Sequence, residues 1–289
     1  HRNLEIIVVD NHSDQNIIKN LYSSEIFLDK RIRLIKNEKN IGVLRNAELA
    51  LKFAKGEFFC WVSDDDWRAD TFIEDLLNLY ILHPNKAIYC SQYQDILDNC
   101  SPSINHLSNK FKVGLLGSKF SVFRQLYFFL LDHAGGKCNY FYSLIPTNYL
   151  RQINFKELSS NWKDLAMDRN IVYFLLRNNR IILTRKKLFA LKNKNLKLYG
   201  DINRVNLNKD NYFLKSKLMI IDLFSEIIIS IKYLKKVWVF FPLFLILIPF
   251  KIALILFTRL KRRVLNFILT RHNYKRNLIE KTAIRNIKE

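Results

Sequence analysis

The first part of the chain alternates between short apolar runs and polar stretches that contain glycine, proline or acidic residues. The run Leu4–Val9, interrupted only by Glu5 and followed by Asp10, predicts a strand that is buried on both faces. Similar but shorter apolar patterns predict three further strands, at Arg31–Lys36, Phe58–Val62 and Ala87–Cys90.

Two helices are expected between these strands. Apolar residues recur at helical spacing over Val43–Phe53, and Gly56 follows as a stop. A second helix is expected after Thr71, which has the spacing of a capping box with Glu74. It carries Phe72, Leu76, Leu79 and Leu82 and is expected to end before Pro84. Because strands and helices alternate, the sequence predicts an α/β domain with a mostly parallel sheet.

The following stretch gives weaker patterns. A helix is expected over Phe120–Leu131 and a strand over Asn139–Ile145. A clearer helix runs from Asp168 to about Arg177, and the strand Ile181–Thr184 follows it. The α/β domain is therefore expected to occupy residues 1–190.

The composition changes after this domain. Residues 191–217 form a basic linker, residues 218–258 are mostly apolar, and residues 259–289 form a tail with 10 Lys and Arg against 2 acidic residues. The 22 residues from 237 to 258 would measure about 33 Å as a helix, enough to cross a hydrocarbon layer of about 30 Å.

If residues 237–258 crossed the membrane once from a cytoplasmic domain, the basic tail would lie outside the cell. Lys and Arg next to membrane helices tend to stay in the cytoplasm instead. Basic residues flank the apolar stretch on both sides, so we expect membrane-associated helices that lie in the interface or bend back near Pro249. An anionic membrane surface is the expected partner of this part. The alternative is a buried core helix with a solvated tail.

Charge is spread unevenly along the 289 residues. Residues 1–100 hold 12 basic and 16 acidic residues, and the remaining 189 hold 35 and 10. Such a basic half favours an anionic partner, either a membrane or a nucleic acid. The nucleic-acid hypothesis requires basic residues interleaved with exposed aromatics on a globular face. Because the cations cluster around the apolar segment instead, no nucleic-acid partner is predicted.

The four cysteines show no close pairing, which argues against zinc. Cys60 and Cys90 lie inside apolar strand patterns, so they are expected to be buried free thiols.

The most informative polar feature is an acidic run, Asp64, Asp65 and Asp66, which follows Ser63 at the end of an apolar stretch. Three adjacent carboxylates repel one another, and a hard divalent cation that also binds a phosphate would offset that repulsion. Asp10 ends another strand, and ligands of parallel sheets bind at the carboxyl ends of strands. The alternative is a solvated acidic turn that caps the next helix.

Five segments in order resemble family 2 glycosyltransferases of the GT-A fold, a Rossmann-like nucleotide-sugar domain. They are Leu4–Asp14, similar to the family's second strand; Asn40–Asn46, similar to N-x-G-x-x-R-N; Ala54–Phe58, similar to A-x-G-E-[FY]; Ser63–Trp67, in the place of the DxD motif; and Ala69–Phe72 with His83 and Pro84. The resemblance is firm over about residues 3–92. It implies an inverting enzyme that transfers a sugar from a UDP- or dTDP-sugar to a hydroxyl of a glycan or lipid-linked acceptor.

The resemblance implies a role for each matching residue. Asp10 would accept the N3–H of uracil or thymine, and Arg45 would contact the base or the phosphates, with Asp65 also at the nucleotide sugar. Asp64 and Asp66 would bind Mn²⁺ or Mg²⁺. The alternatives are a turn-capping role for Asp10 and a surface position for Arg45. Which two of the three aspartates bind the metal stays open, because many members carry an acid in place of Ser63.

A second, weaker resemblance covers Tyr140–Leu150 and the helix around Asp168. It implies that Asp168 is the catalytic base; Asp164 is the rival, and an N-cap role is the structural alternative for Asp168. Trp67 is expected to be a packing residue.

The chain begins at the family's second strand, so the first strand and helix are expected to be missing. We therefore expect poor folding and little activity from these residues alone, and an inactive remnant or membrane-bound partner is the alternative function. The expected place of an active enzyme is the cytoplasmic face of the bacterial inner membrane, in surface polysaccharide biosynthesis.

Overall fold

The computed structural model describes most of residues 1–193 and short stretches beyond them. The described residues are 1–14, 25–64, 66–84, 87–97, 102–103, 115–131, 137–158, 167–193, 224, 227–228, 242–243, 245–254 and 256–257. The chain divides into two compact units, His1–Trp238 and Val239–Glu289, and each is described by itself.

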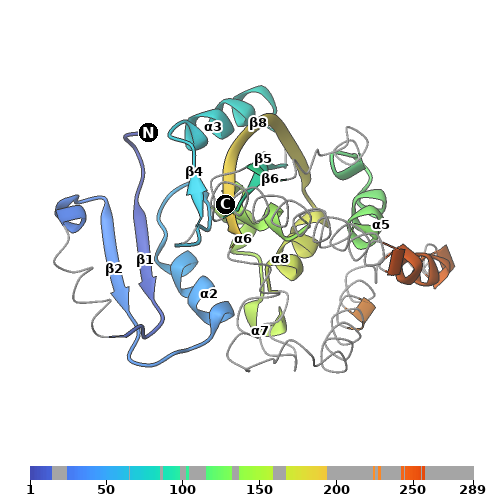
Figure 1. Ribbon diagram of the computed structural model, residues 1–289, viewed down its shortest axis with the longest axis horizontal. Coiled ribbons are helices and arrows are strands. Elements are labelled where there is room, and N and C mark those ends of the chain that lie inside the picture. Colours follow the sequence, from blue (N-terminus) through green and yellow to red (C-terminus); the bar gives the residue numbers. More distant parts are fainter. Residues whose placement is uncertain are drawn as a thin grey trace, which may run out of the picture. The chain divides into compact units, whose positions relative to one another are not determined.

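The first unit contains short strands and helices that alternate along its N-terminal half (Figure 1). The strands are β1 Ile6–Asp10, β2 Ile32–Lys36, β3 Phe58–Phe59, β4 Trp67–Arg68, β5 Ala87–Leu97, β6 Pro102–Ser103, β7 Ile145–Pro146 and β8 Arg180–Asn193. The α-helices are α2 Val43–Phe53, α3 Phe72–Leu82, α5 Ser121–Leu130, α6 Thr147–Leu150, α7 Phe155–Leu158 and α8 Met167–Leu176, and the 3-10 helices are η1 Glu25–Leu28 and η3 Lys137–Tyr142.

Strands β1 and β2 form a parallel pair, drawn side by side in blue in Figure 1. Ile6 is opposite Ile32 and Asp10 is opposite Lys36, so Asp10 lies at the carboxyl end of the pair. The prediction that this strand is buried on both faces is wrong. Ile6 is 42% exposed and the rest of β1 is half-buried. Among the described residues β1 has β2 as its strand partner and α2 as its contacting helix, which together leave part of it open.

A second sheet has the strand order β4-β8-β5-β6. Its central strands β5 and β8 run parallel, from the pair Ala87 and Arg180 to the pair Leu97 and Asn193. The short edge strands β4 and β6 are antiparallel to their neighbours. The two longest pairings of the described residues are thus parallel, as the alternation of strands and helices predicts. β8 runs well past Thr184 because β5 continues to pair with it.

The core of this sheet forms against α3. Burial of apolar side chains is the main term that stabilises such a layer, at about 25 cal/mol per Å² of apolar surface. The buried cluster consists of Phe72, Leu76, Ala87, Tyr89, Leu144, Leu188 and Phe189. Residues from four separate parts of the sequence meet here, so the acidic run and β4 border a well-packed region.

The turn after α2 is clamped from two sides. The Glu5 Oε1 atom accepts hydrogen bonds from the backbone N–H groups of Lys55 (2.5 Å) and Gly56 (2.8 Å). Thr147 donates through Oγ1 to the Gly56 carbonyl at 2.7 Å and through its N–H to the Glu57 carbonyl at 2.8 Å. The acid that interrupts the apolar run of β1 therefore fixes the turn that leads into β3.

Two local predictions are wrong. Residues 137–142 form the 3-10 helix η3 instead of a strand. The rings of Phe141 and Trp61 stack at 4.3 Å and those of Tyr142 and Phe189 lie 5.5 Å apart, so consecutive side chains both find aromatic partners. Successive side chains of a strand point to opposite faces and suit this packing poorly.

The predicted capping box of α3 is also absent. Thr71 is the N-cap, but its side chain makes no capping hydrogen bond and donates to Asp75 Oδ2 at 2.9 Å instead. Its backbone angles, φ −87° and ψ 3°, lie outside the extended region in which an N-cap oxygen faces the free N–H groups. The predicted strand Phe58–Val62 is shorter than expected and ends at Phe59.

In the second unit, residues 245–254 are helical and the side chain of Lys251 is buried. Among the described residues, no helix combines the length and the apolar character needed to cross a bilayer. The predicted linker, membrane-associated segment and basic tail lie largely outside the described residues, so these boundaries stay predictions.

Candidate functional site

Asp10 presents one free carboxylate oxygen at the carboxyl end of β1. Its Oδ1 atom accepts the Ser13 N–H at 2.9 Å, which closes a turn in which His12 has φ 66°. Its Oδ2 atom is shielded from solvent and has no hydrogen-bond partner among the residues that the structure describes. A buried acceptor without a donor is costly, so this atom is suited to receive an N–H group from a ligand.

A network of asparagines surrounds this turn. The buried Asn37 donates through Nδ2 to Asn46 Oδ1 at 2.8 Å and to Asn11 Oδ1 at 3.4 Å. Asn11 donates in turn to Asn40 Oδ1 at 3.1 Å, and Asn46 donates to the Val9 carbonyl at 3.2 Å. These bonds join the ends of β1 and β2 to the start of α2, so they fix the position of Asp10.

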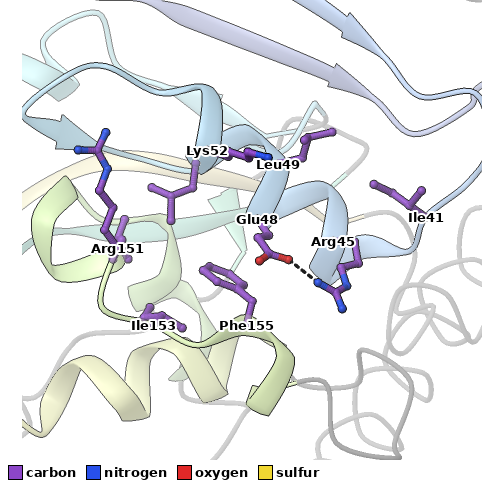
Figure 2. A pocket seen from close by; sticks show the side chains of 10 residues that line it. Ile41, Arg45, Glu48, Leu49, Lys52, Arg151, Ile153 and Phe155 are labelled. Carbon is purple, nitrogen blue, oxygen red and sulfur yellow. Dashed lines mark hydrogen bonds and ion pairs between the residues drawn. The ribbon is translucent and has the colours of Figure 1, made fainter.

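Arg45 lies in a different environment from Asp10. Its Nη1 atom pairs with Glu48 Oε2 at 2.9 Å, and both side chains are partly exposed. Figure 2 shows them beside a groove of about 640 Å³ between α2 and the segment that carries α6 and α7. The groove is lined by Ile41, Arg45, Glu48, Leu49, Leu51, Lys52, Leu150, Arg151, Ile153 and Phe155. Asp10, Asp64 and Asp66 do not line it.

A hydrogen bond holds Ser63, the residue directly before the acidic run. Ser63 Oγ donates to the Tyr142 hydroxyl at 3.0 Å, which ties the run to η3. Asp64 is exposed and Asp66 is half-buried, while Asp65 lies outside the described residues. Trp67 follows with 52% of its surface exposed, so the prediction that it is a packing residue is wrong.

Arg68 lies in an aromatic cage directly after the run. Its Cζ atom is 3.7 Å from the ring centroid of Phe189, and the rings of Phe72 and Tyr142 are 5.5 Å and 5.6 Å away. Burial lowers the pKa of this guanidinium, and the nearby Asp66 opposes that shift. Burial raises the pKa of the neighbouring Cys60 thiol to about 12. At neutral pH the cage therefore holds a cation beside a protonated thiol.

Asp168 lies in the first turn of α8 and is half-buried. Its Oδ1 atom accepts the Arg169 N–H at 2.7 Å. Because the helix already includes Met167, Asp168 does not cap it. The rival base Asp164 lies outside the described residues. α8 packs against η3, the element that carries Tyr142, so Asp168 and the acidic run share a neighbour.

Among the described residues, no hydrogen bond or ion pair joins Asp10, Asp64 and Asp168 directly, and no three His, Cys, Asp or Glu residues form a cluster able to hold a metal. The chemistry of the acidic run still fits Mg²⁺ or Mn²⁺. Both ions prefer oxygen ligands, and Mg²⁺ that is shared with substrate phosphates uses only one or two protein carboxylates. Asp64, exposed and at the end of the strand-like stretch, offers such a ligand.

Sequence reasoning missed four residues that shape this region. Two of them could have been found from their neighbours in the sequence. Glu5 is an acid within an apolar run, and Arg68 is a cation close behind an acidic run. Asn37 and Tyr142 gave no local signal, since their partners are distant in sequence.

The comparisons with known proteins agree with the α/β alternation. Residues 1–141 match the sequence model of the family described as "Glycosyl transferase family 2". This match supports a family 2 glycosyltransferase domain over residues 1–141. The match confirms the predicted family and, with the alternating elements, an α/β fold of the GT-A type. No curated protein matches the chain significantly.

Two solved structures are similar to part of the chain. The crystal structure of S. aureus TarS is 18% identical with a TM-score of 0.46, over 65% of this chain and 31% of that one. The structure of S. aureus TarS 1-349 is 17% identical with a TM-score of 0.45, over 65% of this chain and 51% of that one. The chain thus spans about a third to a half of the length of these structures.

Proposed function

We propose that the protein is an inverting glycosyltransferase that moves a sugar from a UDP- or dTDP-sugar to a hydroxyl of a glycan or lipid-linked acceptor. The observation that carries the proposal is the free Oδ2 atom of Asp10 at the carboxyl end of a parallel strand. Uracil and thymine present an N3–H donor that such an acceptor pairs with. The asparagine network holds Asp10 in place, so the acceptor is preorganised.

Asp64 and Asp66 are the residues that would hold Mn²⁺ or Mg²⁺, with Asp65 beside the nucleotide sugar. When bound, the cation neutralises charge on the nucleoside diphosphate as it leaves. The exposed position of Asp64 and the fixed start of the run at Ser63 support this assignment. Arg45 remains a proposed nucleotide contact; its pairing with Glu48 would have to open for a phosphate to bind.

Asp168 is the proposed base. The acceptor oxygen attacks C1 of the sugar from the side opposite to the diphosphate, while a carboxylate oxygen of Asp168 takes the hydroxyl proton. The bond between C1 and the diphosphate oxygen breaks with its electron pair on that oxygen, so the anomeric configuration is inverted. The half-buried position of Asp168 beside η3 supports this role.

We further propose that the enzyme works on the cytoplasmic face of a bacterial inner membrane, in surface polysaccharide synthesis. The basic residues around the apolar stretch 237–258 support attachment to an anionic membrane surface. Family resemblance alone suggests the pathway.

The test is sugar release or transfer from a panel of nucleotide sugars, with and without Mn²⁺. Asp66→Ala should lower turnover at least a hundredfold. The matched control is Asp70→Ala, since Asp70 is an exposed acid four residues further on, and its turnover should stay within twofold of wild type. Equal turnover in wild type and Asp66→Ala would remove the metal-binding role, and no turnover of any UDP- or dTDP-sugar would refute the donor assignment.

A further inference from the structure

Arg68 occupies an unusual position on the edge strand β4. Side chains of a strand alternate between two faces, and here Trp67 is largely exposed while Arg68 turns into the aromatic cage of Phe72, Tyr142 and Phe189. The face of its guanidinium is therefore covered by rings, and its nitrogens are the only groups left for polar contacts.

Those nitrogens are only partly satisfied. Nη1 donates to the Trp67 carbonyl at 3.1 Å. Nε and Nη2 are shielded from solvent and have no acceptor in the described part of the chain. These two atoms form one edge of the guanidinium, the edge that binds two oxygens of a carboxylate or phosphate side by side.

Another buried arginine shows what a purely structural guanidinium looks like in this chain. Arg124 is 3% exposed, and each of its three nitrogens has a carbonyl acceptor: Leu176, Ser118 with Lys119, and Arg177, at 2.7 Å to 3.2 Å. Arg124 shows that this fold can give every nitrogen of a buried guanidinium an acceptor. Buried charged donors without an acceptor cost several kcal/mol at most sites, which favours a missing anionic partner.

The position of Arg68 indicates which anion that partner is. Arg68 follows Asp66 by two residues, and its Cζ atom lies 5.6 Å from the ring of Tyr142, whose hydroxyl accepts the hydrogen bond from Ser63. The guanidinium thus lies close behind the acidic run and beside the tyrosine that holds Ser63. A cation here complements a group that carries several negative charges, and the proposed function places a diphosphate at this run.

We propose that Arg68 binds the diphosphate of the donor through its Nε and Nη2 edge. The inference rests on the proposed function and adds a second cation, permanent and part of the protein, to the site. A phosphate oxygen reaches the shielded edge when the guanidinium slides within the cage, a movement that keeps its contact with the ring faces.

The test compares ligands with and without phosphates. Dissociation constants of UDP and dTDP are measured by calorimetry, and those of uridine and thymidine by ligand-observed NMR, each with Mg²⁺ and with EDTA. Arg68→Gln should weaken diphosphate binding at least tenfold in both conditions and leave nucleoside binding within twofold. Arg68→Lys keeps the charge but loses the paired donors Nε and Nη2. Its diphosphate affinity should therefore fall by an intermediate three- to tenfold.

The control is Arg31→Gln, because Arg31 pairs with Asp29 on an exposed surface away from β4. It should leave all four affinities unchanged. Unchanged diphosphate affinity in folded Arg68→Gln, or an equal loss of diphosphate and nucleoside affinity, would overturn this inference and leave the proposed function standing. If Arg68→Gln does not fold, unchanged diphosphate affinity in Arg68→Lys has the same meaning. A wild-type protein that binds neither diphosphate would overturn the proposed function and this inference together.

Discussion

The Ser63 hydroxyl donates a hydrogen bond of 3.0 Å to the hydroxyl of Tyr142. This bond links the start of the acidic run to a 3-10 helix that lies far along the sequence. The same tyrosine lies beside Arg68, and its helix packs against α8, which carries Asp168. The helix η3 therefore connects the acidic run, through Tyr142, with the helix that carries the proposed base.

The Ser63–Tyr142 bond can be measured by a double-mutant cycle. Ser63→Ala and Tyr142→Phe should each lower the free energy of unfolding by about 0.5–1.5 kcal/mol, because each removes one partner. The double variant should lose about as much as one single variant, since the bond is lost only once. Tyr142→Phe keeps the ring contacts with Phe141 and Phe189. Additive losses in urea unfolding would show that the two hydroxyls do not interact.

Asp10→Asn tests recognition of the base. The asparagine retains Oδ1 for the Ser13 N–H but replaces the free Oδ2 acceptor with an N–H donor. The N3–H of uracil would then face a donor, so UDP affinity should fall by about ten- to a hundredfold, or about 1.4–2.7 kcal/mol.

Cytosine has an acceptor at N3, so the same change should raise the affinity for CDP relative to UDP. Calorimetry with both ligands gives the ratio, and UDP methylated at N3 serves as the control that already lacks the donor in wild type. An unchanged ratio of UDP to CDP affinity would show that Asp10 does not contact the base.

Local patterns predicted those elements that depend on neighbours in the sequence. α2 and α3 lie where helices are predicted, because the 3.6-residue spacing of their apolar side chains matches the faces that they bury. β2 lies within its predicted strand, and β1 overlaps the predicted Leu4–Val9 and continues to Asp10.

The elements that sequence reasoning missed depend on distant partners. β4 has only two residues and exists because β8 pairs with it. η3 replaces the predicted strand because Phe141 and Tyr142 pack on Trp61 and Phe189. The free edge of Arg68 likewise follows from side chains contributed by β4, α3, η3 and β8, which no local pattern brings together.

Gly42→Ala tests the conformation at the start of α2. Gly42 has φ 84° and ψ 161°, a region that is open essentially to glycine alone. Its N–H also bonds to Asn40 Oδ1 at 3.0 Å. The alanine should lower the free energy of unfolding by about 1–3 kcal/mol and disturb the asparagine network beside Asp10. Val43→Ala is the control at the next, 45% exposed position and should change stability by about 0.5 kcal/mol or less. If Gly42→Ala and Val43→Ala are equally stable in urea unfolding, alanine is not strained at position 42.

The two described thiols make stability sensitive to alkaline pH. Burial raises the pKa of Cys60 and of Cys90 to about 12, above the ordinary thiol value of 9.0. Below pH 9 both the folded and the unfolded protein keep these protons, so stability should not depend on them. Between pH 9 and 12 the unfolded thiols lose protons that the folded ones keep, so the free energy of unfolding should fall as pH rises.

The buried Cys90 gives the sharper measurement. Its thiol lies 2.8 Å from Ser143 Oγ, and it should contribute a fall of at most about 1.4 kcal/mol per pH unit above pH 9. Cys90→Ala removes this titration, so its stability should decline less steeply with pH than that of wild type, whatever its starting value. In native protein at pH 8, labelling with a thiol reagent followed by mass spectrometry should find Cys90 unmodified, and denaturation should expose it. Prompt labelling of Cys90 in the native state, or parallel pH profiles for the two proteins, would show that the folded thiol titrates as an exposed one does.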